Sequence, residues 1–161
     1  MRVRILLAFF ILMSFQLLAQ KERDPGTYNY EVQFIRTGLE GTELFKVFTY
    51  CKKEKDCFEY AKIDALKAIL FKGIPGSGLQ RPLVNEAGGE DKYRDYFKAF
   101  FSEGGKYLNF VAISNDGSIE DDDRLKVGKQ LKIGVVVSVQ KANLRRELES
   151  AGIVKKLSEG F

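Results

Sequence analysis

The residues that could bind an anion lie in the glycine-rich segment Phe71 to Gly78, FKGIPGSG. A phosphate-binding loop follows a strand and opens a helix, so that free backbone N–H groups and the positive end of the helix dipole face the anion. Here the glycines follow a helical pattern instead, and the G-x-x-x-x-G-K-[ST] motif is missing. We therefore predict a helix end and a turn, with Gly73 as the C-cap in positive φ and Pro75 preventing continuation.

Cys51 and Cys57 are the two cysteines of the chain, and they bracket a charged segment. In an exported chain this spacing allows a disulfide that closes the loop between a strand and a helix. The alternatives are two separate thiols, buried or free, and a redox role for Cys57 near a helix N-terminus, where a thiolate is favoured. The C-x-x-C motif is missing, and two thiols without an imidazole are too few for a zinc site.

The acidic segment Ser114 to Asp123, SNDGSIEDDD, resembles a calcium-binding EF-hand loop in part. Its first ligand position would be Ala112, which has no ligand oxygen, and its flanks have the pattern of strands rather than helices. We therefore predict a solvated hairpin loop and no metal site.

The chain contains no histidine, which removes Ser-His-Asp and Cys-His catalysis and nearly every zinc site with imidazole ligands. The nearest candidates for carboxylate catalysis, Glu120 to Asp123, lie in a loop with no visible catalytic partner. We therefore predict that the protein is not an enzyme and needs no cofactor.

The elements around these residues follow from periodicity. The alternating runs Tyr28 to Arg36 and Thr42 to Tyr50 predict a hairpin. Asp56, with Glu59 three residues later, has the spacing of a capping box, and a helix is predicted from Cys57 to Lys72. This helix is apolar on more than one face, so it is either covered on both sides or binds a partner.

The second half of the chain continues the pattern. A helix is predicted from Asp91 to Glu103, with an aromatic stripe that we interpret as core. A central strand is predicted from Tyr107 to Ile113, and a short helix from Asn143 to Ala151. Between them, alternating apolar residues predict antiparallel strands with one buried face and a bulge or turn near Gly128 and Lys129. The residues of that expected buried face are Leu125, Val127, Leu131, Ile133, Val135, Val137 and Val139.

The expected order is therefore β-β-α-α-β-β-α, which predicts an α+β fold, an antiparallel sheet with helices packed on one face. The first 19 residues, with Arg2 and Arg4 before an apolar run, match a cleavable signal peptide. Residues 20–161 are expected to form one domain with a flexible tail at 20–27, and no stable membrane span remains after cleavage.

The charge balance argues against nucleic-acid binding. The chain has 26 basic and 22 acidic residues, and removing Arg2 and Arg4 leaves 24 basic residues against the same 22 acids. A net charge of about +2 is small for a nucleic-acid surface, which needs a strongly basic face.

The run Gly41 to Val84, GTELFKVFTYCKKEKDCFEYAKIDALKAILFKGIPGSGLQRPLV, resembles uncharacterised exported proteins of Gram-negative bacteria. In them, too, a strand of the form G-x-x-x-x-K-V-x-x-Y leads into an Ala-rich helix and a Gly-rich F-K-G loop. More distantly, the pattern of the chain is similar to small envelope lipoproteins and to the N-terminal domain of flagellar assembly protein T. Neither resemblance implies catalytic residues, and the lipoprotein cysteine is missing here.

These observations predict an exported protein, periplasmic or extracellular, that acts by binding a partner of the cell envelope as an accessory or assembly component. A homo-oligomer is compatible with the sequence. The alternative is a small-ligand or glycan-binding module that uses Tyr28, Tyr30 and Tyr50. The predicted partner-binding residues form a helix face and a flexible exposed loop, and they are Ile63, Leu66, Leu70, Gly73, Pro75, Gly76, Gly78, Arg81 and Pro82.

Overall fold

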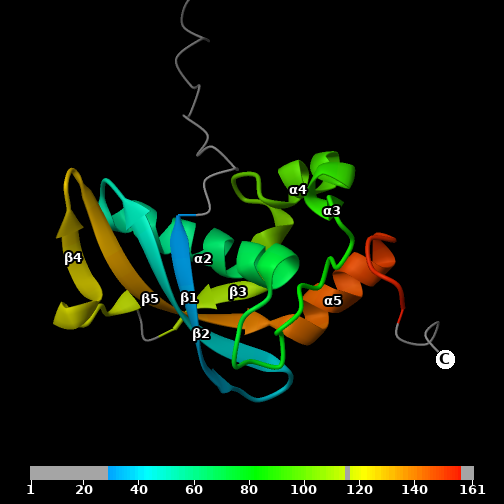
Figure 1. Ribbon diagram of the computed structural model, residues 1–161, viewed down its shortest axis with the longest axis horizontal. Helices are drawn as coiled ribbons and strands as arrows, with labels where there is room; N and C mark the ends of the chain where they lie inside the picture. The colour runs from blue at the N-terminus through cyan, green and yellow to red at the C-terminus, as the bar shows by residue number, and fades with distance from the viewer. Residues whose placement is uncertain (1–28, 115–116, 157–161) are drawn as a thin grey trace, which may run out of the picture.

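The computed structural model describes residues 29–114 and 117–156, which fold as a curled antiparallel sheet with helices (Figure 1). The strands are β1 (Tyr30–Thr37), β2 (Thr42–Cys51), β3 (Val111–Ile113), β4 (Arg124–Val127) and β5 (Gln130–Gln140). Their order is β1-β2-β5-β3, and β4 pairs with the other end of β5 on the edge that β3 occupies. The predicted α+β class is confirmed.

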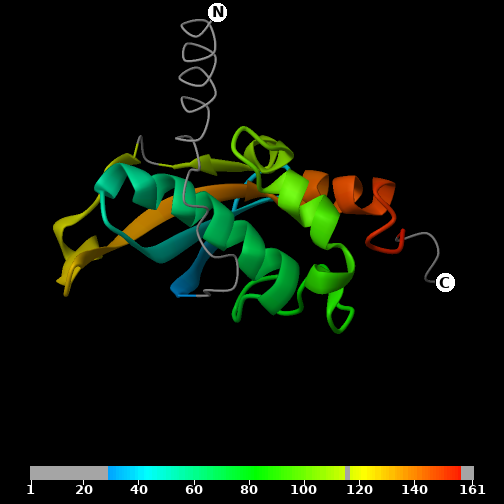
Figure 2. The ribbon, with the colours of Figure 1, turned by 90° about the horizontal axis from the view of Figure 1, so that it is seen from above.

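The two longest strands form the centre of the sheet and bury one face. Phe45 and Val47 of β2 and Val135 and Val137 of β5 alternate with half-buried residues, as the sequence pattern predicts. Helix α2 (Glu54–Lys67) lies along this face and brings Ala61 and its other small side chains close to the strands (Figure 2). The core of the protein is therefore the layer between α2 and the central strands.

The start of α2 differs from the prediction. The helix begins at Glu54, after Lys53, and no side chain caps its N-terminus. The backbone N–H of Asp56 donates to the carbonyl of Lys53 at 2.9 Å, so Asp56 lies inside the first turn and cannot act as the cap. The predicted capping box is wrong. At its other end the helix continues through a π-helical turn, η1 (Ala68–Lys72).

The predicted aromatic helix is present as two short pieces, α3 (Gly89–Lys92) and α4 (Arg94–Phe100). Tyr93 separates them with φ −109° and ψ 29°, which is not helical. Phe97 and Phe100 are buried, and the Phe97 ring meets the edge of Phe71 with 4.9 Å between ring centroids. The aromatic stripe is core, as expected.

The predicted central strand from Tyr107 to Ile113 is wrong. Its first part is a 3-10 turn, η2 (Lys106–Asn109), and its last three residues form β3 at the edge of the sheet. The Tyr107 side chain is buried, and its hydroxyl donates to a carboxylate oxygen of Glu59 at 3.2 Å. Burial, reinforced by this carboxylate, raises the pKa of Tyr107 to about 12.

The expectation that Leu125 and Val127 share the buried face of β5 is also wrong. Gly128 and Lys129 form a two-residue turn, and Leu125 pairs with Lys132 across it. Paired residues of antiparallel strands share a face, so Leu125 lies with Lys132 on the open face of the sheet. Leu125 is 56% exposed and Val127 is 47% exposed. Helix α5 (Lys141–Ser150) follows β5 directly.

The predicted signal peptide and Tyr28 lie outside the described residues. Among the helices that the structure describes, none combines the length and the apolar character needed to cross a membrane.

Candidate functional site

A groove of about 1370 Å³ runs between the loop that follows η1 and the C-terminal part of the described chain. One wall is formed by residues 77–86 with Lys92 and Tyr93. The other wall is formed by three residues of α5 and by residues 152–156. Figure 1 shows the loop running from η1 up to α3 beside α5.

The first wall is anchored on the end of the long helix. The π-helical turn ends where the N–H of Gly73 donates to the carbonyl of Ala68 at 2.8 Å. The next two carbonyls, of Ile69 and Leu70, accept hydrogen bonds from the N–H groups of Leu83 and Val84 at 3.0 and 2.9 Å. Carbonyls at a helix end lack intrahelical partners, so the returning arm of the loop satisfies them.

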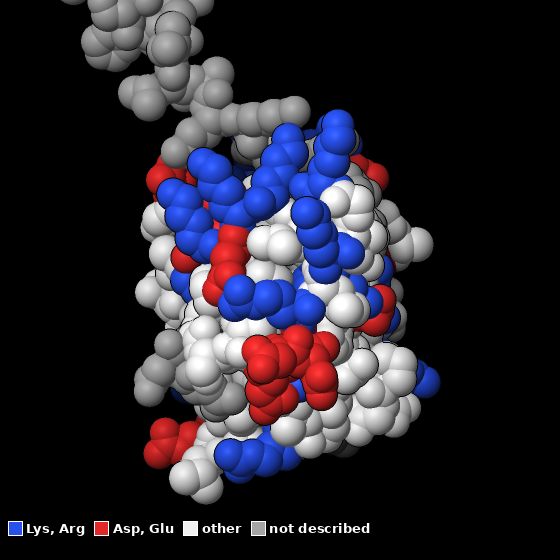
Figure 3. Space-filling model, turned by 90° about the vertical axis from the view of Figure 1, so that its left-hand side faces the viewer, with Lys and Arg blue, Asp and Glu red and all other residues white. Residues whose placement is uncertain are grey.

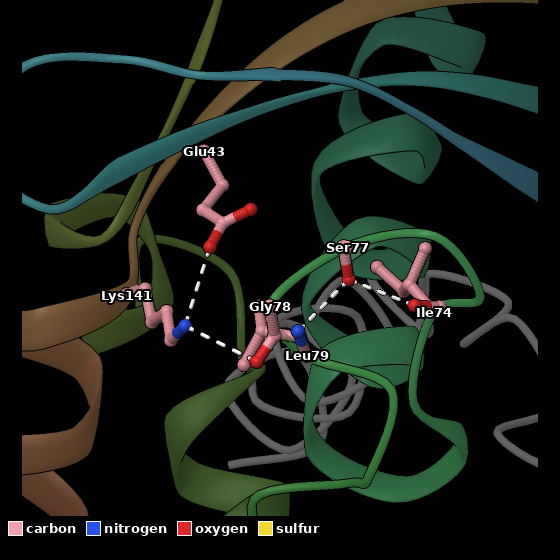
Figure 4. Close-up of polar contacts among 6 residues, drawn as sticks. All are labelled: Glu43, Ile74, Ser77, Gly78, Leu79 and Lys141. Carbon is pink, nitrogen blue, oxygen red and sulfur yellow. Dashed lines mark hydrogen bonds and ion pairs between the residues drawn. The ribbon is translucent and has the colours of Figure 1, made fainter.

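A second set of bonds closes the loop on itself (Figure 4). The Ser77 hydroxyl donates to the carbonyl of Ile74 at 2.7 Å and accepts from the N–H of Leu79 at 2.9 Å. Gly73 has φ 77°, and a Cβ atom there would lie 2.2 Å from the backbone oxygen of Gln80. The position therefore requires glycine, and the predicted C-cap and turn are confirmed.

The expectation of an exposed loop is correct only in part. Ile74, Ser77 and Leu79 are buried, because they form the inner side of the hydrogen-bonded turn. The exposed residues among those predicted to bind a partner are Pro75, Gly76, Gly78 and Arg81, whereas Gly73 and Pro82 are half-buried. Of the whole predicted loop set, Gly78, Arg81 and Pro82 line the groove.

A buried carboxylate lies beside the groove. Glu43 of β2 is 3% exposed, and its Oε1 lies 3.2 Å from Nζ of Lys141, the first residue of α5. The same Nζ lies 3.5 Å from the carbonyl oxygen of Gly78 (Figure 4). Glu43 Oε2 is buried and accepts no hydrogen bond from any described residue. Lys141 thus joins strand, helix and loop, and it lines the groove.

Sequence reasoning missed this pair. Glu43 lies two and four residues before Phe45 and Val47 in an alternating strand, so its side chain points to the same, inward face. Such a position is a usable signal for a buried ion pair. Nothing in the local sequence identifies Lys141 as its partner, because the two residues are 98 positions apart.

Among the charged residues that line the groove, cations outnumber acids. Glu86 and Glu149 are the acids of the lining, and each is already paired: Glu86 with Lys92 and Glu149 with Arg145, both at 2.8 Å. The basic residues of the lining are Arg81, Lys92, Lys141, Arg145, Lys155 and Lys156. Of these, the side chains of Arg81, Lys155 and Lys156 have no ion pair with a described residue.

The predicted helix face is not available to a partner. Leu66 and Leu70 are fully buried, and Ile63 is half-buried against the core. The second side of the helix is covered by other parts of the same chain. The Phe101 ring lies under Lys67, whose Nζ is 5.9 Å from the ring centroid, and the N–H of Val84 in the returning loop donates to the carbonyl of Leu70. Of the two explanations for a helix that is apolar on more than one face, the structure therefore supports packing within the chain on both sides.

The remaining candidates have structural explanations. Cys51 and Cys57 form a buried disulfide with Cα atoms 5.3 Å apart, which confirms the disulfide among the three alternatives. Asp123 of the acidic loop lies 2.7 Å from Lys46 Nζ, and this hydrogen bond raises the pKa of Lys46. Part of that loop, residues 115–116, lies outside the described residues. Among the residues that are described, no cluster of three potential metal ligands occurs.

The described tyrosines of the alternative hypothesis, a small-ligand or glycan-binding module, do not share a surface. Tyr30 pairs with Thr49 on the buried side of the sheet and lies under Lys72, whose Nζ is 4.5 Å from the ring centroid. Tyr50 pairs with Lys132 on the open side. Two rings on opposite faces cannot form one binding platform.

No protein-family model matches the chain, and comparisons with curated proteins and with solved structures find no significant match. The resemblance seen in the segment Gly41 to Val84 therefore stays a prediction.

Proposed function

We propose that this is an exported, non-enzymatic binding protein that serves as an accessory or assembly component of the cell envelope. Its groove holds an acidic, extended segment of a partner protein. The observation that carries this proposal is the set of three lining cations, Arg81, Lys155 and Lys156, without an ion pair in the described part of the chain. The disulfide is consistent with an oxidising compartment outside the cytoplasm.

The size of the groove favours a polypeptide over a small molecule. Pockets for small ligands usually measure about 300–1,000 Å³, and this groove is larger, at about 1370 Å³. Arginine and lysine on both walls can bind carboxylates along an extended chain, and Arg81 can do so with two parallel hydrogen bonds.

The loop wall supports the same function through its rigidity. Its backbone is bonded to η1 at Ile69 and Leu70 and to itself through Ser77. A wall that is ordered before binding does not lose conformational entropy when the partner arrives. The groove can therefore bind with a modest number of contacts.

Site-specific photo-crosslinking in intact cells tests the proposal. A photoreactive residue at Gln80, an exposed residue of the lining, should give one discrete protein adduct, whose cross-linked peptide is rich in Asp and Glu. The same probe at Leu39, which is 87% exposed and outside the groove, should not give this adduct.

Charge reversal provides the second arm. Combining Arg81→Glu with Lys156→Glu should lower the adduct yield by about tenfold or more, because like charges then face each other. Lys98→Glu, a charge reversal at an exposed residue outside the lining, is the control and should leave the yield unchanged. An adduct that survives the double reversal, or the failure of any adduct to form at Gln80, would refute the proposed function.

A further inference from the structure

A group of lysines gathers at the end of the sheet opposite the groove. Lys52 and Lys53 follow β2, Lys55 lies in the first turn of α2, Lys126 lies on β4 and Lys129 lies in the β4–β5 turn. We call these five residues the basic tip. Figure 3 shows this end of the molecule, with blue side chains gathered above a separate block of acids.

The strand register explains why they lie together. Cys51 and Lys126 are both partners of Leu131, from its two sides, so the ends of β2 and β4 flank the same residue of β5. An ion pair between Arg124 and Glu54, at 3.0 Å, joins β4 to the start of α2.

The charge of the basic tip is not neutralised within the described part of the protein. All five lysines are exposed, and none of their side chains has an ion pair or a hydrogen bond with a described residue. Of the nearest acids, Glu54 is already paired with Arg124, and Asp56 is half-buried in the first turn of the helix.

Two exposed aliphatic side chains lie on the same hairpin. Leu125 is 56% exposed and Val127 is 47% exposed, and both lie on the face of β4 opposite Lys126. A lipid surface that meets the hairpin at its end can contact both faces, because the apolar groups can enter the region below the headgroups while the lysines contact phosphate. A soluble polyanion would use the lysines and gain nothing from Leu125 and Val127.

We propose that the basic tip, together with Leu125 and Val127, docks the protein onto a lipid surface that carries anionic headgroups. This proposal is independent of the groove, because none of the seven residues lines it.

Vesicle flotation tests the proposal, with phosphatidylcholine vesicles compared with vesicles that contain about one third phosphatidylglycerol. The parent protein and all variants are prepared in the same form, so any contribution of residues 1–19 is common to them and is measured on the neutral vesicles. We expect stronger partition onto the anionic vesicles, and a decrease of about fivefold for each lysine neutralised.

Three double variants separate the possible outcomes. Lys126→Gln with Lys129→Gln should weaken partition by about 25-fold, and Leu125→Ser with Val127→Ser should weaken it several-fold. All four residues are exposed, so the variants should fold. The control, Lys155→Gln with Lys156→Gln in the groove, should leave partition unchanged.

Equal partition onto neutral and anionic vesicles would overturn the proposal. Loss of partition in the control as well would also overturn it, because the attraction would then reflect net charge alone. If the lysine variant loses partition and the Leu125 and Val127 variant does not, the tip binds anionic headgroups by charge alone, and the role proposed for Leu125 and Val127 is wrong.

Discussion

Replacing Lys141 by methionine should destabilise the protein by about 3 kcal/mol, because it leaves the Glu43 carboxylate buried without its cation. The Glu43 side chain is 4% exposed, and Lys141 Nζ, 3.2 Å away, is its ion-pair partner. Breaking a buried ion pair costs about 3–5 kcal/mol. The Lys141 side chain is 31% exposed, so water can approach the vacated position, and we therefore expect the lower end of that range.

Urea unfolding followed by circular dichroism at pH 7 measures this loss, and two further variants identify its cause. Lys92→Met breaks the pair with Glu86, in which both side chains are 52% exposed, and it should cost less than about 1 kcal/mol. The double variant Glu43→Met with Lys141→Met removes both charges and should recover most of the stability, because two apolar groups need no ion partner.

Two results would refute the reasoning. If Lys141→Met costs no more than Lys92→Met, the Glu43 carboxylate is solvated and the site beside the groove is not the buried pair described above. If the double variant is as unstable as Lys141→Met, the loss comes from packing of the lysine stem rather than from the unpaired carboxylate.

Three further predictions use the same unfolding assay. Gly73→Ala should cost at least about 3 kcal/mol and Gly76→Ala about 1 kcal/mol, since both have positive φ but only the first would place its Cβ against backbone; equal losses would contradict the close approach. Because its folded-state pKa of about 12 exceeds the ordinary 10.0, Tyr107 contributes stability that is complete below pH 10 and is lost as the pH rises through 12. Wild type should therefore lose about 2 kcal/mol more than Tyr107→Phe over that interval, and parallel pH profiles would disprove the shift. Replacing Cys51 and Cys57 together by alanine should cost about 2 kcal/mol, the loop-closure entropy of a short loop; an unchanged midpoint would show that the bridge does not constrain the unfolded chain.

Local patterns were sufficient for the parts of the fold that depend on neighbouring residues. Alternation identified β2 and β5, and helical periodicity with glycine and proline identified the end of the long helix at Gly73. The aromatic stripe around Phe97 predicted a buried cluster for the same reason, because spacing along a helix determines which side chains share a face.

The parts that failed depend on pairing between distant segments. Leu125 lies an even number of residues before the apolar residues of β5, which suggested that they share a buried face. The two-residue turn instead pairs Leu125 with Lys132, so Leu125 lies on the opposite face of the sheet. Similarly, the apolar run ending at Ile113 suggested a central strand, although only its last three residues form a strand, which pairs with β5 at the edge of the sheet. Sequence alternation gives the faces of one strand and does not state which partner it meets.

The groove could not be predicted from local patterns either, because its two walls come from segments that are distant in the sequence. A π-helical turn at the end of α2 leaves the carbonyls of Ile69 and Leu70 to accept from Leu83 and Val84, so the loop returns along the helix instead of extending into solvent. That return places Arg81 opposite the chain that follows α5, and the Lys141 contact to Gly78 links the two walls. The basic tip lies at the other end of the sheet (Figure 1), so a partner in the groove and a lipid surface at the tip would not compete for space. If both proposals hold, the protein keeps a partner segment beside a membrane surface, and each surface can be altered without touching the other.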